Sequence, residues 1–188
     1  MEQRYLILVD EQSQKDRLKR IARSLRNEGI LLVYEEINPN ECSVRKDNGD
    51  LSLDKVALEN KLASISFLSH LDVFATDYNL VTDELKGIDM IEMLYSLQPH
   101  YRKQVVIYSA QIDEVIDDII TKRAKGFKQQ VEMLKILAQT DIHYLSGEGE
   151  FENEFKSLIA KEPDITIDSR LIDSLHTLNC DNLKCSIP

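Results

Sequence analysis

The first 34 residues alternate between an apolar run, an amphipathic helical pattern and a second apolar run. Residues 5–9 and 30–34 are unbroken hydrophobic stretches, which is typical of strands that are covered on both faces. Apolar positions recur between them at helical spacing: Leu18, Ile21, Ala22 and Leu25. We expect this helix to begin at an N-cap Ser13 and to end at Gly29. So short a unit requires parallel strands joined by a right-handed crossover.

The same alternation continues to residue 160. Further strand-like runs cover residues 71–76, 104–108 and 142–145, and helical patterns cover residues 53–70, 88–99, 113–138 (with a break at Gly126) and 151–160. These units predict an α/β fold, a doubly wound five-stranded parallel sheet of order 2-1-3-4-5 with helices on both faces. We assign residues 1–162 to one domain and expect the tail, 163–188, to pack on it or to dock a partner. Residues 38–50 are polar and are predicted to be an exposed loop.

Composition narrows the classes of partner. The chain of 188 residues has 33 acids against 23 bases and a net charge of -10, which disfavours binding to nucleic acid. One basic cluster, residues 122–128, is either a solvated helix face or a docking patch for an acidic partner. No apolar stretch reaches the roughly 20 residues that a membrane span needs. The N-terminus does not look like a signal peptide, so we expect a cytoplasmic protein.

The three cysteines, Cys42, Cys180 and Cys185, do not suggest a disulfide framework. His176 precedes the last two, but the spacing matches no structural zinc module and a fourth ligand is missing. We therefore expect reduced thiols without a structural role.

Polar residues follow three of the predicted strands. Asp10 and Glu11 end the first, Asp77 ends the third, and Ser109 ends the fourth. Because sites in open α/β sheets form at the carboxyl ends of strands, we expect these residues to meet there. Mg²⁺ prefers oxygen ligands, so the pattern predicts a magnesium-assisted site that accepts a phosphoryl group.

Each of these residues also has a simpler interpretation. Asp10 and Glu11 would form an exposed pair that caps the next helix, and Asp77 would be an N-cap or Asx-turn residue. Ser109 would be an ordinary strand-terminal serine.

The order of these strand-end residues along the chain resembles that of the receiver domain of two-component response regulators, a flavodoxin-like fold. The resemblance covers residues 3–160. Asp10 and Glu11 look like the acidic pair that holds Mg²⁺, and Asp77 looks like the phosphoacceptor. Asn79 matches the position whose backbone carbonyl completes the metal shell. The run from Gly87 to Asp89 looks like the start of the third helix, and Ser109 with Ala110 looks like the hydroxyl switch.

The resemblance implies a set of functional properties. Mg²⁺ would be the cofactor, and Ser109 would hydrogen-bond the transferred phosphoryl group. His143 or Tyr144 would be the switch aromatic. The partners would be a histidine kinase or phosphotransfer protein, an effector protein, and in addition a second copy of the chain as a homodimer.

Three departures from the family pattern concern switching. Residues 144–150 contain no Lys where the family has one after the fifth strand, Leu80 stands where Pro is common, and the segment 109–146 is longer than usual. With Ser109 as the sole remaining sensor, we expect the surface around residues 112–128 and 142–149 to be largely preset for its partner.

Three functions remain open. The first is a single-domain response regulator that is phosphorylated on Asp77 and acts by protein contact. The second is a degenerate receiver that binds its partner without phosphorylation. The third is a Mg²⁺-dependent phosphohydrolase, although no acid–base pair or cap insertion supports it. We expect no enzymatic activity beyond self-phosphorylation.

Overall fold

The computed structural model describes residues 1–45, 51–81, 84–109, 115, 126–144 and 148–161. Three parts of the sequence analysis lie outside them: the predicted tail with His176, Cys180 and Cys185, most of the basic cluster, and most of the predicted surface at 112–128. Within the described part of the chain, no helix is long and apolar enough to cross a membrane.

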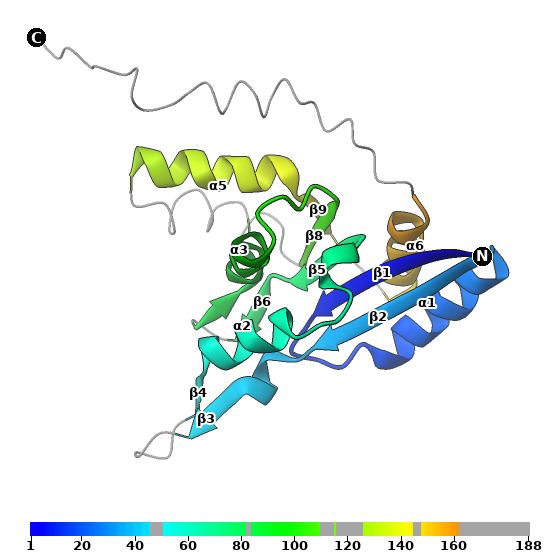
Figure 1. The fold of residues 1–188 in the computed structure, drawn as a ribbon, viewed down its shortest axis with the longest axis horizontal. Helices are drawn as coiled ribbons and strands as arrows, with labels where there is room; N and C mark the ends of the chain where they lie inside the picture. Colours follow the sequence, from blue (N-terminus) through cyan, green and yellow to red (C-terminus); the bar gives the residue numbers. More distant parts are fainter. Residues whose placement is uncertain (46–50, 82–83, 110–114, 116–125, 145–147, 162–188) are drawn as a thin grey trace, which may run out of the picture.

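The central sheet has five parallel strands in the order β2-β1-β5-β8-β9 (Figure 1). Their bounds are β1 (Glu2–Val9), β2 (Ile30–Ile37), β5 (Val73–Asp77), β8 (Gln104–Ser109) and β9 (Asp141–Tyr144). The predicted order 2-1-3-4-5 is therefore confirmed. The other strands form two small antiparallel ribbons: β3 (Ser43–Arg45) with β4 (Leu51–Leu53), and β6 (Asn79–Val81) with β7 (Leu85–Lys86).

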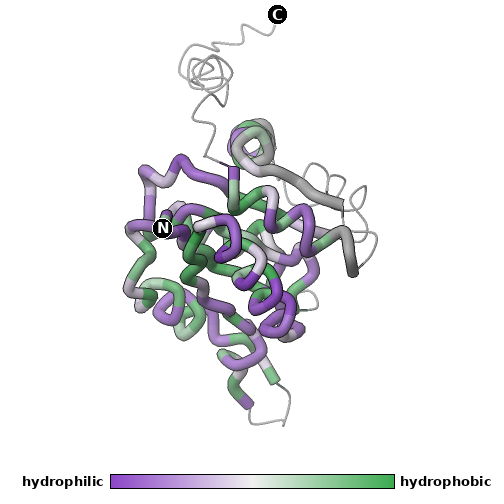
Figure 2. Tube along the Cα trace, turned by 90° about the vertical axis from the view of Figure 1, so that its right-hand side faces the viewer, coloured by the Kyte–Doolittle hydropathy of each residue, from purple (hydrophilic) through white to green (hydrophobic). Residues whose placement is uncertain are grey.

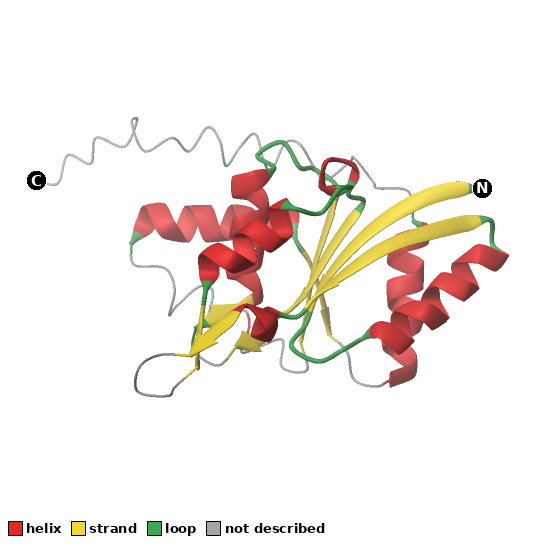
Figure 3. Cartoon of the chain, turned by 60° about the horizontal axis from the view of Figure 1, so that its bottom comes forward, coloured by secondary structure: helices red, strands yellow, loops and turns green. Residues whose placement is uncertain are grey.

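Helices cover both faces of the sheet, as predicted. One face packs against α1 (Lys15–Asn27) and α6 (Glu148–Ala160), and the other against α2 (Lys55–Ala63) and α3 (Gly87–Leu97), with α5 (Phe127–Gln139) beside β9 (Figures 1 and 3). Because side chains alternate along a strand, β1 buries Leu6 and Leu8 on the first face and Ile7 and Val9 on the second. The hydrophobic segments accordingly gather between the layers in Figure 2.

The first helix confirms its buried stripe and corrects its start. Leu18, Ile21 and Leu25 are buried, and Gly29 has the positive φ of 85° that a helix-ending glycine favours. The N-cap, however, is Gln14 and not Ser13. Glu36 of β2 accepts hydrogen bonds from the Gln14 backbone N–H and the Ser13 hydroxyl, so a neighbouring strand satisfies the helix end.

Two further predictions were wrong in their boundaries. The helix predicted over 53–70 is shorter: α2 ends at Ala63, and a 3₁₀ turn, η2 (Leu68–His70), follows. Residues 38–50 are not only loop, because a 3₁₀ turn, η1 (Pro39–Cys42), and strand β3 occupy most of the described part of this segment. Asp54 caps α2 by accepting a 2.9 Å hydrogen bond from the Ala57 N–H.

Candidate acidic site

The strand register brings the predicted residues to one edge of the sheet. Val9 pairs with Thr76, and Asp77 pairs with Tyr108. Asp10, Asp77 and Ser109 therefore lie at the carboxyl ends of three adjacent strands, β1, β5 and β8. The arrangement follows from parallel pairing alone. Neighbouring parallel strands that end at the same register place their last residues side by side.

Asp10 is a buried carboxylate that three donors hold in place. It is only 3% exposed. Its Oδ1 accepts from the Gln12 N–H at 2.7 Å, and its Oδ2 accepts from the Gln14 side-chain amide at 2.9 Å and from the Tyr108 hydroxyl at 2.7 Å. The interpretation of Asp10 as an exposed capping residue is therefore wrong.

Asp77 is half-buried and electrostatically disfavoured as an anion. Burial, and then the negative charge of Asp10, raise the pKa of its carboxyl to about 7, and Glu11 adds a smaller effect in the same direction. The backbone N–H groups of Asn79 and Tyr78 act in the opposite direction. A carboxylate beside a second buried carboxylate is a place where a cation would relieve repulsion.

Glu11 and Asn79 lie on the rim of this pair. Both are exposed. The Glu11 backbone carbonyl accepts a 2.9 Å hydrogen bond from the Asn38 amide. The Asn79 backbone N–H lies 3.4 Å from Asp77 Oδ1, and its side-chain oxygen accepts from Lys86 at 2.9 Å.

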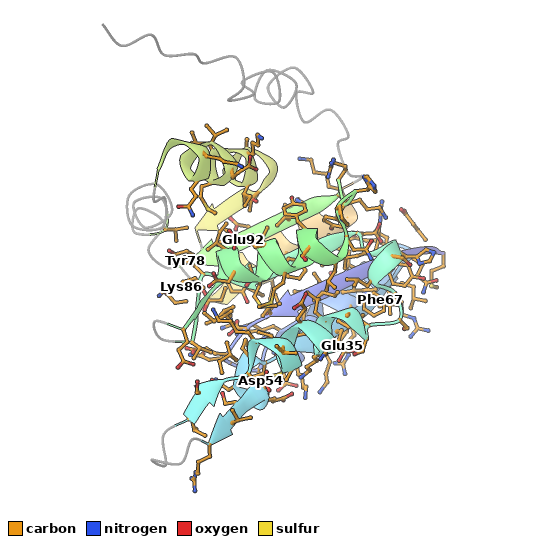
Figure 4. All side chains as sticks on the ribbon, turned by 60° about the vertical axis from the view of Figure 1, so that its left-hand side comes forward. Glu35, Asp54, Phe67, Tyr78, Lys86 and Glu92 are labelled. Atoms are coloured by element: carbon orange, nitrogen blue, oxygen red, sulfur yellow. The ribbon has the colours of Figure 1, made fainter. Side chains whose placement is uncertain are left out.

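Lys86 is a nearby cation that the sequence patterns did not single out. The β6–β7 ribbon pairs it with Asn79, and its ammonium group lies 5.6 Å from the centre of the Tyr78 ring. Tyr78 and Lys86 are seen close together in Figure 4. A lysine directly before Gly87 is the only sequence signal for it, and the ribbon that places it was not predicted.

Gly87 lets α3 begin directly against the acceptor strand. A Cβ at this position would lie 2.5 Å from the Asp77 backbone oxygen and 3.0 Å from a Thr76 methyl group. The Gly87 N–H donates to the Tyr78 carbonyl at 2.8 Å. Asp89, in the first turn, accepts a 2.7 Å hydrogen bond from the Lys86 N–H. Only glycine fits this approach without moving the Asp77 backbone.

Tyr108 is the second residue that the sequence patterns missed. Its hydroxyl reaches Asp10, while its ring packs edge-on against Phe151 and Phe155 of α6, with centroids 5.5 and 5.7 Å away. Burial, and then the charge of Asp10, raise the pKa of Tyr108 well above its usual value, so it remains a hydrogen-bond donor. A polar-tipped aromatic residue one position before a strand end is a weak signal for this role.

The remaining predicted residues lie on β8 and β9. Ser109 is 4% exposed and pairs in register with Tyr144, and His143 pairs with Tyr108. The side chains of His143 and Tyr144 lie outside what the structure describes, so the switch aromatic stays a prediction.

The donor set fits a cation held mainly by two carboxylates. Among the described residues, no three acidic, histidine or cysteine side chains form a group that could hold a metal ion. A carboxylate has about four lone-pair sites, and the three donors on Asp10 leave about one for a cation. Mg²⁺ usually keeps several waters and needs only one or two carboxylates, so Asp10 and Asp77 are the side chains that would hold such an ion.

Three solved structures are similar in arrangement. The chemotaxis protein CheY4 of Vibrio cholerae is 10% identical with a TM-score of 0.42, over 84% of this chain and 98% of its own. A transiently phosphorylated switch of bacterial signal transduction is 16% identical with a TM-score of 0.42, over 85% and 97%. DJ-1beta of Drosophila melanogaster is 14% identical with a TM-score of 0.31, over 92% and 98%.

No protein-family model and no curated protein matches the chain. The assignment of the fold to the doubly wound, flavodoxin-like arrangement therefore rests on the strand order and register of the chain itself.

Proposed function

We propose that the protein is a response-regulator-like signalling protein that accepts a phosphoryl group on Asp77 and acts through protein contact. One observation carries the proposal: Asp77 ends β5 at the edge of the sheet, next to the buried carboxylate of Asp10. Two acids on neighbouring strand ends, with a hydroxyl residue on the third, are the functional groups that acyl-phosphate formation needs.

The roles follow from chemistry and position. Asp10 and Asp77 are the side chains that would hold Mg²⁺, with Glu11 and the Asn79 backbone carbonyl on the rim. The bound ion would supply charge neutralisation for the transferred group. Ser109, the last residue of β8, would donate a hydrogen bond to a phosphoryl oxygen.

The reaction is a single displacement at phosphorus. The ionised Asp77 carboxylate attacks, an Asp77 oxygen–phosphorus bond forms, and the donor's phosphorus–oxygen bond breaks with its electron pair leaving on the departing group. Because the pKa of Asp77 is about 7 when no cation is present, the Asp77 carboxyl is ionised in only part of the molecules at neutral pH. Any cation near Asp77 increases the reactive fraction.

Intact-mass measurement with Mg²⁺ and a small phosphodonor tests the proposal. We expect the wild type to gain the mass of one phosphoryl group and Asp77→Asn to gain none. Asp16→Asn, which removes an acid 84% exposed at its side chain on α1, is the matched control and should be modified like the wild type. Equal modification of wild type and Asp77→Asn, or none in either, would reject Asp77 as the acceptor.

Lys86 gives a second test at the same site. Lys86→Gln removes the cation beside Asn79 and Tyr78, which in this proposal contacts the transferred phosphoryl group. A charge-assisted hydrogen bond of this kind is worth about 1.5–3 kcal/mol. We expect phosphorylation by the same donor to slow about 10- to 100-fold, measured as the rate of mass gain. Lys61→Gln, which breaks an exposed ion pair with Glu41, should leave the rate unchanged. Equal rates for the two variants would show that Lys86 does not contact the transferred group.

A phosphorylation-independent binding module is the second candidate function, and Asp10 favours it. Its three hydrogen bonds already hold the carboxylate in place without a cation. If the mass experiment shows no modification while the protein still binds an effector, this function replaces the first.

A further inference from the structure

Tyr108 connects the acidic site to a helix that packs on one face of the sheet. The hydroxyl donates to Asp10 Oδ2, and the ring lies edge-on to the two phenylalanines of α6. Those two rings are stacked on one another with centroids 4.3 Å apart. A displacement of the Tyr108 hydroxyl therefore moves a ring that α6 packs around.

A second chain of contacts leads from the same carboxylate to the same helix. Gln14 donates to Asp10 through its amide nitrogen and accepts from Arg17 through its oxygen, at 3.0 Å. The guanidinium of Arg17 lies 5.3 Å from the centre of the Phe151 ring. Both routes start at Asp10 and end on Phe151, so the state of Asp10 has two physical connections to α6.

The end of α6 that these routes reach is anchored to α1. Arg20 of α1 pairs with Glu152 at 2.6 Å, and Lys156 pairs with Glu28 just beyond α1. These pairs are partly exposed, whereas Phe155 and Ile159 are almost fully buried. The apolar side of α6 thus faces Tyr108 and the sheet, while its rim contacts α1.

We infer that Tyr108 is a positioning residue that sets the orientation of the Asp10 carboxylate and couples the occupancy of the acidic site to the packing of α6. The inference rests on the proposed function for the identity of the ligand, Mg²⁺. The element that responds is α6. Groups that support a metal ligand from behind commonly change metal affinity 10- to 100-fold when removed.

Tyr108→Phe tests this inference because it keeps the ring and removes only the hydroxyl. Tyr101→Phe is the matched control: Tyr101 is also buried, and its hydroxyl lies within hydrogen-bond distance of the backbone carbonyls of Asp72 (3.0 Å) and Gln104 (2.9 Å) at the opposite end of the sheet. The probe is Mg²⁺ alone. The readouts are its dissociation constant by titration calorimetry and the hydrogen exchange of residues 148–160.

We expect the wild type and Tyr101→Phe to bind Mg²⁺ with equal affinity. In both, Mg²⁺ should change the hydrogen exchange of α6. In Tyr108→Phe we expect the dissociation constant to rise at least about tenfold. The change in α6 at saturating Mg²⁺ should become smaller, because only the route through Gln14 and Arg17 remains. If the wild type binds Mg²⁺ while α6 exchanges unchanged, or if Tyr108→Phe behaves like Tyr101→Phe, the inference is overturned and the proposed function stands.

A second arm needs no metal. Asp10→Asn removes the charge and keeps the shape, and it is compared alone and together with Tyr108→Phe. We expect Asp10→Asn to alter α6 exchange when the Tyr108 hydroxyl is present and to have a smaller effect on α6 when it is combined with Tyr108→Phe. If the wild type binds no Mg²⁺, but Asp10→Asn changes α6 exchange more when the Tyr108 hydroxyl is present, the result would reject the cation and support the coupling between Asp10 and α6. No effect of Asp10→Asn alone on α6 would overturn the coupling itself.

Discussion

Without a divalent cation, the contribution of Asp77 to the stability of the protein is expected to fall as pH rises from about 4 to about 7. Burial and the charge of Asp10 raise the pKa of Asp77 from 3.8 to about 7 in the folded state. Between these values the folded protein keeps a proton that the unfolded chain has released, so each pH unit lowers the free energy of unfolding. The contribution is present in full below the unfolded pKa and is lost once pH passes the folded pKa.

The size of this effect has an upper bound. One pKa unit corresponds to about 1.4 kcal/mol, and screening by solvent at a half-buried group reduces that figure. Urea unfolding of the wild type at a series of pH values, in the presence of a chelator, measures it. Asp77→Asn removes the titrating group, so the difference between the two curves isolates Asp77 from the other acids. Asp16→Asn is the control and should follow the wild type.

Added Mg²⁺ should reverse the trend above pH 7. A ligand present at 100 times its dissociation constant stabilises the folded state by about 2.7 kcal/mol. We expect this gain in the wild type and none in Asp77→Asn. A wild-type curve that stays parallel to that of Asp77→Asn across the whole pH range, in the presence of the chelator, would mean that burial and Asp10 do not raise the pKa of Asp77.

The arrangement of the sheet could be predicted from the sequence because it depends on local patterns. Unbroken apolar runs mark strands covered on both faces, and the helical spacing of Leu18, Ile21 and Leu25 marks the side that packs on them. Once the strands are parallel, the register brings Asp10 and Asp77 to one edge without further information. The fold and the central acid pair therefore follow from periodicity and strand ends.

The parts that could not be predicted depend on contacts between distant residues. Ser13 has the right chemistry for an N-cap, but Glu36 from β2 serves the helix end instead. The β3–β4 ribbon is held at Leu53, whose N–H donates to Glu84 at 2.7 Å, 31 residues further along the chain. Strands of two or three residues have no period to recognise, so the ribbon that places Lys86 was also missed.

Tyr108 shows the same limit inside a correctly predicted strand. Its strand was predicted from residues 104–108, and its apolar ring fits that pattern. The function of its hydroxyl depends on Asp10, 98 residues earlier, which the pattern of a single strand does not contain.

Gly87→Ala is expected to damage both the stability and the acidic site. The new Cβ would lie 2.5 Å from the Asp77 backbone oxygen, closer than atoms pack, so the start of α3 or the end of β5 must move. Overpacking of this kind typically costs about 1–3 kcal/mol. Alanine forms helices better than glycine, so a loss at this first helical residue must come from the clash.

Gly29→Ala separates this clash from the general cost of replacing a glycine. Gly29 has a positive φ of 85° and no atom within 4 Å of a Cβ, so alanine there is strained in its backbone by about 1–2 kcal/mol without touching a neighbour. Both variants should unfold at lower urea concentration than the wild type. Only Gly87→Ala should also lose Mg²⁺-dependent stabilisation and phosphoryl acceptance, because only there does the shift reach Asp77. If Gly87→Ala kept both properties at wild-type level, the close approach of α3 to the acceptor strand would not be a requirement of the site.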